Sequence, residues 1–199
     1  MTAASGPASI DRLARSIARC RACRLHEGRT HAVPGEGPPH PEAMLIGEAP
    51  GEQEDLLARP FVGPSGRVLD ALFQECSLSR EDLFITSSVK CRPPKNRNPK
   101  TDELATCKAT WLDAQISALD PPLVLLLGSV ALRCVLGPIG RMKDLHGSVH
   151  SYRHRPLLIT YHPSAALRFP WARRAMQQDL ALLTDMLSSN PSDRASGRE

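Results

Sequence analysis

The chain has 199 residues, 41% of them hydrophobic, which is enough for one well-buried domain but cramped for two. Its formal net charge of +4 fits a nucleic-acid partner, although many soluble enzymes carry a similar excess. The segment MTAASGPASIDRLARSIARC lacks the apolar core of a signal peptide and no apolar run reaches membrane-span length, so we expect a cytoplasmic protein with reduced cysteines and no membrane partner.

In chain order, a helix is predicted over residues 10–20 (IDRLARSIARC), and a Gly/Pro-rich loop follows over 33–42 (VPGEGPPHPE). Four apolar runs of strand length come next, at 43–47, 83–87, 123–128 and 156–160. Helical patterns lie between these runs, notably at 66–76 and 102–119.

The alternation of these elements indicates the architecture. Strands that are too apolar to face water on one side, and that alternate with helices, are typical of a parallel sheet covered on both faces. We therefore predict an α/β fold: a three-layer α/β/α sandwich with a central, mainly parallel four-stranded sheet. The single domain is expected to span residues 1–187, and the polar segment 188–199 is expected to be a disordered tail.

Most of the residues with candidate catalytic or binding side chains lie in the loops that follow the predicted strands. In open α/β sheets, ligands bind beyond the carboxyl ends of the strands. Because the four loops after the strands share that edge, Glu48, Lys90 and His162 are predicted to converge there. Pro163 keeps His162 extended at a strand end, and Ser164 is predicted to cap the next helix. The loops are GEAPGEQED (47–55), SSVKCRPPKNRNP (87–99), GSVA (128–131) and YHPSAALR (161–168).

Each motif also has a simpler interpretation. GEAPG can be a tight strand-to-helix turn in which Gly47 and Gly51 supply backbone freedom. His-Pro-Ser can be a capped turn, RPFVGPSG (59–66) a hydrophobic plug followed by a turn, and KCRPPKNRNPK (90–100) a solvated basic loop. Their joint placement at strand ends favours the functional interpretation.

Four of the six cysteines have a spacing that suits a metal site. A C-x-x-C unit and two distant thiolates can close a tetrahedral four-sulfur site that ties the N-terminal helix to the loop after the second strand. The residues alone leave iron-sulfur, zinc and inert buried thiols open. Cys76 and Cys134 lie in apolar surroundings and are predicted to be core residues. The candidate ligands are Cys20, Cys23, Cys91 and Cys107.

In this order and with these cysteine spacings, GEAPGEQED, RPFVGPSG, ITSSVKCRPPKNRNP and YHPSAALR closely resemble the iron-sulfur, or family 4, uracil-DNA glycosylases of the uracil-DNA glycosylase superfamily. The resemblance covers about residues 17–187. It implies that the four cysteines bind a 4Fe-4S cluster with a structural role. It also implies a monofunctional DNA repair hydrolase that flips uracil, or another deaminated base, out of DNA and cuts the N-glycosidic bond, which leaves an abasic site. The resemblance fits a nucleoid-associated bacterial or archaeal monomer.

The resemblance further implies a role for each matching residue. His162 donates a hydrogen bond to uracil O2, where negative charge collects as the bond breaks. Glu48 positions the attacking water and favours the cationic sugar. Gly47 and the backbone around Ala49 hold the base, and Phe61 stacks on it.

The DNA contacts implied by the resemblance lie in the same loops. Leu167 is the candidate wedge that fills the stack emptied by flipping. The basic and hydroxyl side chains expected to contact phosphates are Lys90, Arg92, Lys95, Arg97, Ser164 and Arg168.

Two features depart from known patterns. Ser87 stands where the relatives usually carry an asparagine that reads the uracil edge, so the range of accepted bases is open. RPPKNRNPKT contains no histidine, which argues against the covalent trapping of uracil-DNA found in some relatives. An iron-sulfur DNA-binding module without catalysis and a redox protein remain alternatives, but the retention of both Glu48 and His162 favours the enzyme.

Overall fold

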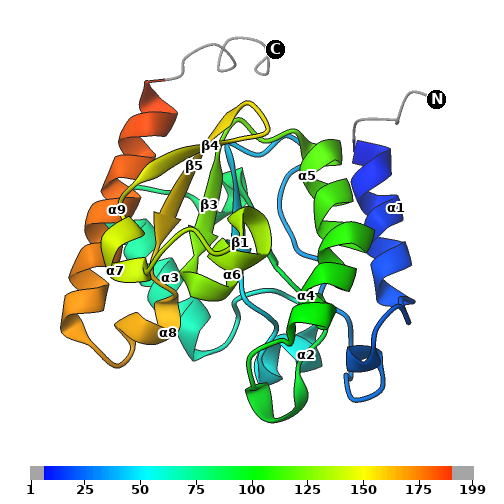
Figure 1. Ribbon diagram of the computed structural model, residues 1–199. Helices are drawn as coiled ribbons and strands as arrows, with labels where there is room; N and C mark the ends of the chain where they lie inside the picture. Colours follow the sequence, from blue (N-terminus) through cyan, green and yellow to red (C-terminus); the bar gives the residue numbers. More distant parts are fainter. Residues whose placement is uncertain (1–6, 190–199) are drawn as a thin grey trace.

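Five strands form the central sheet of the computed structural model, which describes residues 7–189 of the chain (Figure 1). Their spatial order is β2-β1-β3-β5-β4, and only β4 runs antiparallel to its neighbour. The predicted α/β fold with a mainly parallel sheet is confirmed, and the predicted number of strands is corrected from four to five. The strands are β1 Ala43–Gly47, β2 Leu83–Ser87, β3 Val124–Leu127, β4 Val149–Tyr152 and β5 Arg155–Thr160.

The strand absent from the prediction is β4. Its residues alternate between exposed and half-buried, so it lacks the continuous apolar run that marks the other strands. A tight turn at Arg153 and His154 joins it to β5 with positive φ angles of 48° and 69°. The turn lacks the Asn-Gly or Asp-Gly pair that usually signals a hairpin.

Helices occupy the connections between the strands. The predicted helix over 102–119 is divided by a π turn, Lys108–Leu112, into α4 and α5. The last helix includes Ser188, the first residue of the predicted tail, and the part of that tail from residue 190 onward lies outside the described residues. The helices are α1 Pro7–Ala18, α2 Glu52–Leu57, α3 Pro64–Glu75, α4 Thr101–Cys107, α5 Asp113–Leu119, α6 Gly128–Leu136, α7 Met142–Leu145, α8 Pro163–Ala166 and α9 Pro170–Ser188.

The two faces of the sheet carry separate apolar clusters, because successive strand residues point to opposite sides. Leu45 and Leu158 pack with α3 and α9 on one face. Met44 and Leu126 pack with α5 and α6 on the other face. Helices therefore cover both sides of the sheet, which gives the three predicted layers (Figure 1). No helix within residues 7–189 is long and apolar enough to cross a membrane.

Candidate functional site

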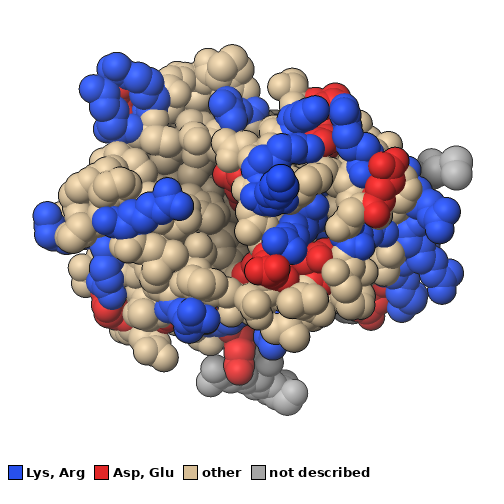
Figure 2. Space-filling view, turned by 90° about the horizontal axis from the view of Figure 1, so that it is seen from below, with Lys and Arg blue, Asp and Glu red and all other residues tan. Residues whose placement is uncertain are grey.

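The carboxyl ends of the four parallel strands meet at the lower end of the molecule in Figure 1. Gly47 at the end of β1 is in register with Ser87 at the end of β2, and Leu127 of β3 is in register with Thr160 of β5. Figure 2 views this end and shows Lys and Arg side chains around a hollow, with Asp and Glu near its middle. The predicted convergence of the loops after these strands is therefore observed.

Phe61 lies between β1 and the histidine that follows β5. Its ring is 7% exposed, and its centroid is 5.8 Å from that of His162 at an interplanar angle of 36°. A Cβ on Gly47 would lie 2.5 Å from Phe61 Cζ and 3.6 Å from Ser87 Oγ. Only glycine at position 47 lets the Phe61 ring approach the end of β1 this closely. Four of the predicted site residues therefore lie in one small region: Gly47, Phe61, Ser87 and His162.

The loop that carries Phe61 is held by Glu54 of α2. Phe61 has a left-handed φ of 51°, which is costly for a bulky side chain. The Glu54 carboxylate accepts hydrogen bonds from the backbone N–H groups of Val62 at 2.9 Å and Gly63 at 2.7 Å, and also from that of Gly51 at 3.1 Å. Glu54 was not among the predicted site residues. Its signal was the spacing of Gly51 and Glu54 at the start of a helix, which is half of a capping box.

His162 is itself the N-cap of α8. Its Nδ1 accepts a hydrogen bond from the Ser164 backbone N–H at 3.2 Å and lies 2.8 Å from Ser164 Oγ. The predicted cap, Ser164, is wrong, because the helix begins at Pro163 and places Ser164 inside the first turn. Since a backbone N–H can only donate, Nδ1 is an acceptor and the proton of the neutral ring is on Nε2.

Burial sets the charge of His162. Loss of solvent lowers the pKa of the imidazole to about 4, which outweighs the opposing effect of the Glu54 carboxylate. The ring is therefore neutral at neutral pH. Gly128, at the start of α6, has a φ of 90°, and a Cβ there would lie 2.8 Å from His162 Cβ. This close approach explains the glycine in GSVA, for which the sequence analysis gave no specific role.

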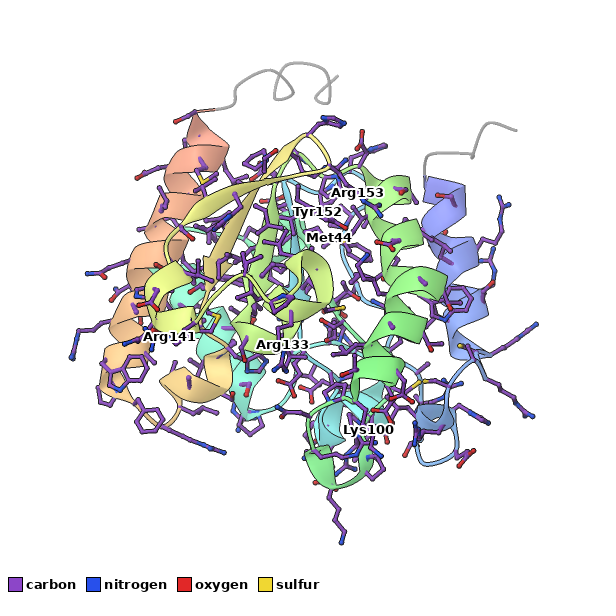
Figure 3. All side chains as sticks on the ribbon, in the orientation of Figure 1. Met44, Lys100, Arg133, Arg141, Tyr152 and Arg153 are labelled. Carbon is purple, nitrogen blue, oxygen red and sulfur yellow. The ribbon has the colours of Figure 1, made fainter. Side chains whose placement is uncertain are left out.

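Glu48 follows β1 directly and is partly exposed. Burial raises the pKa of its carboxyl above the ordinary value of 4.5, and the charge of Arg133 opposes the shift. Arg133, another residue that the sequence analysis missed, lies on α6 (Figure 3). The next residue, Ala49, packs against the apolar cluster around the cysteines.

The four predicted cysteine ligands gather in one region. Cys91 and Cys107 are buried in a cluster against which Cys23 packs, and Cys91 is close enough to Cys20 and Cys23 for their charges to interact. The ion pair between Arg24 and Asp102 ties the C-x-x-C segment to α4. The segment lies beyond α1, which ends at Ala18 and not at Cys20 as predicted.

The sulfurs in this region already receive hydrogen bonds. Trp111 Nε1–H donates to Cys20 Sγ at 3.0 Å, and Arg29 Nη1–H donates to Cys91 Sγ at 2.8 Å. Burial raises the pKa of the Cys107 thiol to about 12, so this sulfur ionises only when a cation replaces its proton. Within residues 7–189, no three ligating side chains converge closely enough to hold a single metal ion, so the thiols are spaced too widely to share one ion. The four thiols nevertheless lie in one region, and two of their sulfurs accept hydrogen bonds from N–H groups there.

Of the remaining cysteines, Cys76 is buried and Cys134 is half-buried, each against a main apolar cluster. Neither thiol joins the group of four. Both positions agree with the predicted core role.

Lys90 does not reach the surface, so its predicted phosphate contact is wrong. Its side chain is 1% exposed, and its ammonium donates to Thr86 Oγ1 at 2.6 Å and to the Ser87 carbonyl at 2.8 Å. The ammonium lies near Cys107. The sequence could not indicate this, because a lysine in a basic loop is usually solvated.

The other basic residues of this loop differ in availability. Arg97 forms a bidentate pair with the buried Glu103 at 2.7 and 2.9 Å, so its guanidinium is already occupied and its predicted phosphate contact is not supported. Arg92 donates to Asn96 Oδ1 at 2.7 Å and forms an ion pair with the exposed Glu52 at 3.5 Å, but it remains partly exposed, and Lys95 is exposed. Lys100 projects at the same end of the molecule, whereas Tyr152 and Arg153 lie at the opposite end (Figure 3).

On the opposite side of the site, α8 and its following loop present Leu167, which is 49% exposed, and Arg168, which is also exposed. Both lie within seven residues of His162 in the sequence. Both side chains are therefore accessible to a partner bound at this edge of the sheet.

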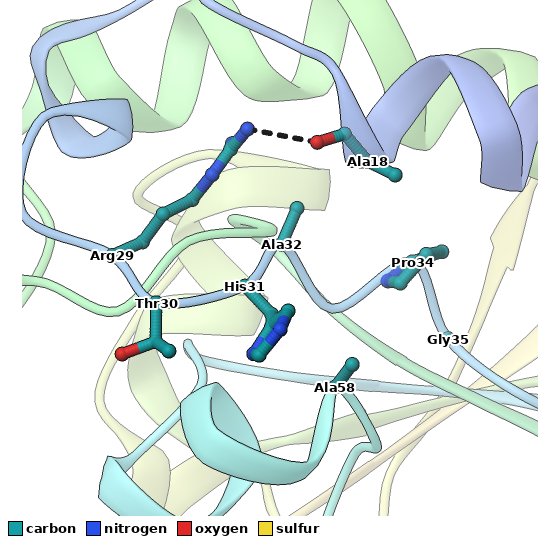
Figure 4. A pocket seen from close by; sticks show the side chains of 8 residues that line it. All are labelled: Ala18, Arg29, Thr30, His31, Ala32, Pro34, Gly35 and Ala58. Carbon is teal, nitrogen blue, oxygen red and sulfur yellow. Dashed lines mark hydrogen bonds between the residues drawn. The ribbon is translucent and has the colours of Figure 1, made fainter.

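A cavity of about 390 Å³ lies beside the cysteine region (Figure 4). Arg29 enters it and donates to the Ala18 carbonyl at 3.0 Å as well as to Cys91 Sγ. Two other lining residues are held by the buried Asp55, which accepts hydrogen bonds from the backbone N–H groups of Thr30 at 2.9 and 3.0 Å and of His31 at 3.3 Å. None of the predicted catalytic residues lines this cavity.

Comparison with known proteins gives a consistent result. Residues 34–181 match the Uracil DNA glycosylase superfamily. The type-4 uracil-DNA glycosylase of Saccharolobus solfataricus is 39% identical over 192 residues, which cover 92% of this chain and 88% of the relative. The type-4 enzyme of Pyrobaculum aerophilum is 40% identical, over 87% of this chain and 92% of the relative. The type-5 uracil-DNA glycosylase of Thermus thermophilus is 34% identical, over 74% and 76%. With its strand-end loops and its cysteine group, the chain therefore belongs to the uracil-DNA glycosylase superfamily.

Proposed function

We propose that this protein is a DNA repair glycosylase that flips uracil out of DNA and hydrolyses its N-glycosidic bond, leaving an abasic site. The observation that carries the proposal is the state of His162. Its Nδ1 is used as an acceptor by Ser164 and its pKa is about 4, so the neutral ring offers Nε2–H as a donor at the edge shared by Glu48 and Phe61. A neutral donor suits a leaving group whose negative charge develops only as the bond breaks.

The reaction needs two opposite charges to be stabilised as they separate. When the bond between the sugar C1′ and uracil N1 breaks, its electron pair goes to the base, and the negative charge spreads to O2. The Nε2–H of His162 donates to that oxygen. The Glu48 carboxylate faces the positive sugar and orients a water, whose oxygen bonds to C1′ and whose proton is released. The raised pKa of Glu48 marks it as partly desolvated, and such desolvation strengthens its electrostatic interactions.

Phe61 and Ser87 are the proposed contacts to the base. The Phe61 ring supplies an apolar surface for stacking, and Gly47 and the backbone near Ala49 border it. Ser87 is 5% exposed and offers one hydroxyl near the ring. A hydroxyl satisfies fewer groups on the uracil edge than an amide, so we propose that other deaminated bases are accepted as well.

The DNA strand is proposed to lie along the basic end of the molecule (Figure 2). Leu167 serves as the wedge, and Arg168 and Ser164 lie beside it. Across the site, Arg92 and Lys95 are the available phosphate contacts, while Lys90 and Arg97 are not. We propose that the protein acts as a monomer in the cytoplasm, associated with the nucleoid.

We propose that Cys20, Cys23, Cys91 and Cys107 hold a 4Fe-4S cluster. The donor set fits, because four thiols from three segments lie together and two of the sulfurs already receive N–H donors. The bound cluster would tie the C-x-x-C segment to the loop after β2. The buried ammonium of Lys90 is near enough to Cys107 to offset part of its negative charge.

The test is direct. The protein is incubated with a duplex that carries one uracil, and the DNA is then cleaved at abasic sites with hot alkali. Cleavage at the uracil position, none in a matched thymine duplex and none with a Glu48→Gln, His162→Ala double variant are expected. Binding to the uracil duplex without any cleavage by the wild type would replace the enzyme with a DNA-binding iron-sulfur module.

A further inference from the structure

Two aromatic side chains beside the site are exposed and have no role in the reaction proposed above. Phe169 is 47% exposed and Trp171 is 50% exposed, next to the exposed Leu167. We propose that Phe169 and Trp171, here called the aromatic platform, bind an unpaired nucleobase of the DNA strand by stacking. The platform would favour single-stranded over fully paired DNA. This inference rests on the proposed function only in taking DNA as the partner.

The rings of the platform are arranged as a rigid surface. Their centroids are 5.7 Å apart and their planes differ by 22°, so they stack on each other. Tyr161 meets Trp171 edge to face at 5.2 Å and 81°, and Tyr161 directly precedes His162 in the chain. The Phe169 backbone N–H donates to the Ala165 carbonyl at 2.9 Å, which fixes the start of α9 against α8. The platform is thus attached to the segment that carries His162 and Leu167.

Charge beside the platform suits a nucleic acid. Arg168 precedes Phe169, and Arg174 lies about one helical turn after Trp171; both are exposed. Arg173 is paired with Glu75 through bonds of 2.6 and 3.0 Å, whereas neither Arg168 nor Arg174 forms an ion pair within the described residues. Two free guanidinium groups flanking a ring surface match the alternation of phosphate and base along a single strand.

The exposed area is too small for a stable protein partner. A large aromatic side chain presents about 150–250 Å², so the exposed halves of Leu167, Phe169 and Trp171 together give roughly 300 Å². A specific protein interface needs about 800 Å² from each partner. One nucleobase needs only a single flat face. Bases within a duplex are already stacked on both sides, so the platform is useful where a base is unpaired, as it is beside a flipped nucleotide.

The experiment measures affinity for uracil-free DNA, and therefore does not depend on catalysis. The probes are a labelled oligothymidine strand and a fully paired duplex of the same length, titrated by fluorescence anisotropy. Trp171→Ala and Phe169→Ala are each expected to weaken single-strand binding by about 5- to 100-fold, the range for losing one stacked base. Duplex affinity should change by less than about threefold. The matched control is Val149→Ala, which removes an equally exposed apolar side chain (48%) from β4.

Ring-keeping variants separate stacking from a loss of structure. Trp171→Phe and Phe169→Tyr should retain the single-strand affinity, and the quenching of tryptophan fluorescence by oligothymidine should disappear in Trp171→Phe. Unchanged affinity in both alanine variants overturns the proposal. So does a wild-type dimer that Trp171→Ala dissociates, because the face would then bind a second copy. Failure of the proposed function would instead appear as a wild type that binds oligothymidine through the platform but releases no uracil.

Discussion

Glu54→Ala is expected to slow base release without touching any group that reacts. The variant removes one carboxylate that accepts three backbone hydrogen bonds, at 2.7, 2.9 and 3.1 Å. Two of these bonds, from Val62 and Gly63, hold the Phe61 loop, so at about 1 kcal/mol for each bond the native loop loses about 2 kcal/mol. The left-handed conformation of Phe61 costs about 1–2 kcal/mol by itself. Without the bonds to Glu54, the loop is therefore expected to relax to another backbone conformation. A displacement of the ring by about 1 Å corresponds to a rate loss of about 100-fold.

The assay is single-turnover excision from a uracil duplex with saturating enzyme, so that weaker DNA binding does not contribute. Glu52→Gln is the matched control, because it removes the same charge from the first turn of the same helix, where the side chain is 62% exposed and pairs only with Arg92 among the described residues, at 3.5 Å. A change at Arg92 bears on DNA binding, which saturating enzyme keeps out of the measured rate. Glu54→Gln removes the charge that raises the pKa of His162, so that pKa should fall further. A Glu54→Ala variant with the wild-type rate would refute the idea that this carboxylate positions Phe61.

The other predictions concern the reacting groups, the base and the cysteines. His162→Ala should slow base release by about 100- to 1000-fold while DNA affinity stays the same, because it removes a donor to developing charge; a normal rate would contradict that role. As the pH falls, Glu48 protonates before His162, since burial raises the first pKa above 4.5 and lowers the second to about 4. The single-turnover rate should therefore be level through neutral pH and fall only in the acid range, as Glu48 gains its proton, whereas a midpoint near the ordinary histidine value of about 6.5 would give His162 an unshifted pKa. Ser87→Asn should release uracil about 5- to 100-fold faster and act less on hypoxanthine and xanthine, all three substrates being assayed in parallel; slower uracil release would mean that Ser87 does not read the base. Protein purified without oxygen should contain about four iron atoms per chain by elemental analysis, and Cys91→Ala should lose iron and thermal stability together; stoichiometric zinc without iron would refute the cluster.

The sequence predicted the parts of the fold that depend on continuous apolar runs. Strands β1, β2 and β3 are buried throughout and β5 is buried from Leu157 to Thr160, so each appears in the sequence as a continuous, mainly apolar run. The edge strand β4 could not be found in this way, because its residues alternate between exposed and half-buried and none is fully buried. The convergence of Glu48 and His162 followed from topology alone.

What the sequence could not supply were contacts made between distant loops. Lys90 and Arg97 looked like free cations because their loop is rich in Lys and Arg, yet one is buried against Thr86 and the other is bound to Glu103. The spacing of Gly51 and Glu54 indicates only the start of a helix, and the path of the chain is what brings Val62 and Gly63 onto the Glu54 carboxylate. The partners of Glu54 are backbone N–H groups, which every residue except proline carries, so residue identity does not single them out.

Glu54 and Asp55, adjacent carboxylates on α2, couple the local unfolding of two loops. Glu54 holds the Phe61 loop, while Asp55 holds the segment at Thr30 that follows Arg29 and its bond to Cys91. Because α2 has only six residues, it opens as a unit, and one opening event frees both loops. A ligand bound at the cysteine region makes this opening less favourable. By linkage, its binding free energy therefore also stabilises the native position of the Phe61 ring beside His162. In hydrogen exchange, the amides of Thr30 and Val62 should therefore lose protection together, although 32 residues separate them in the chain.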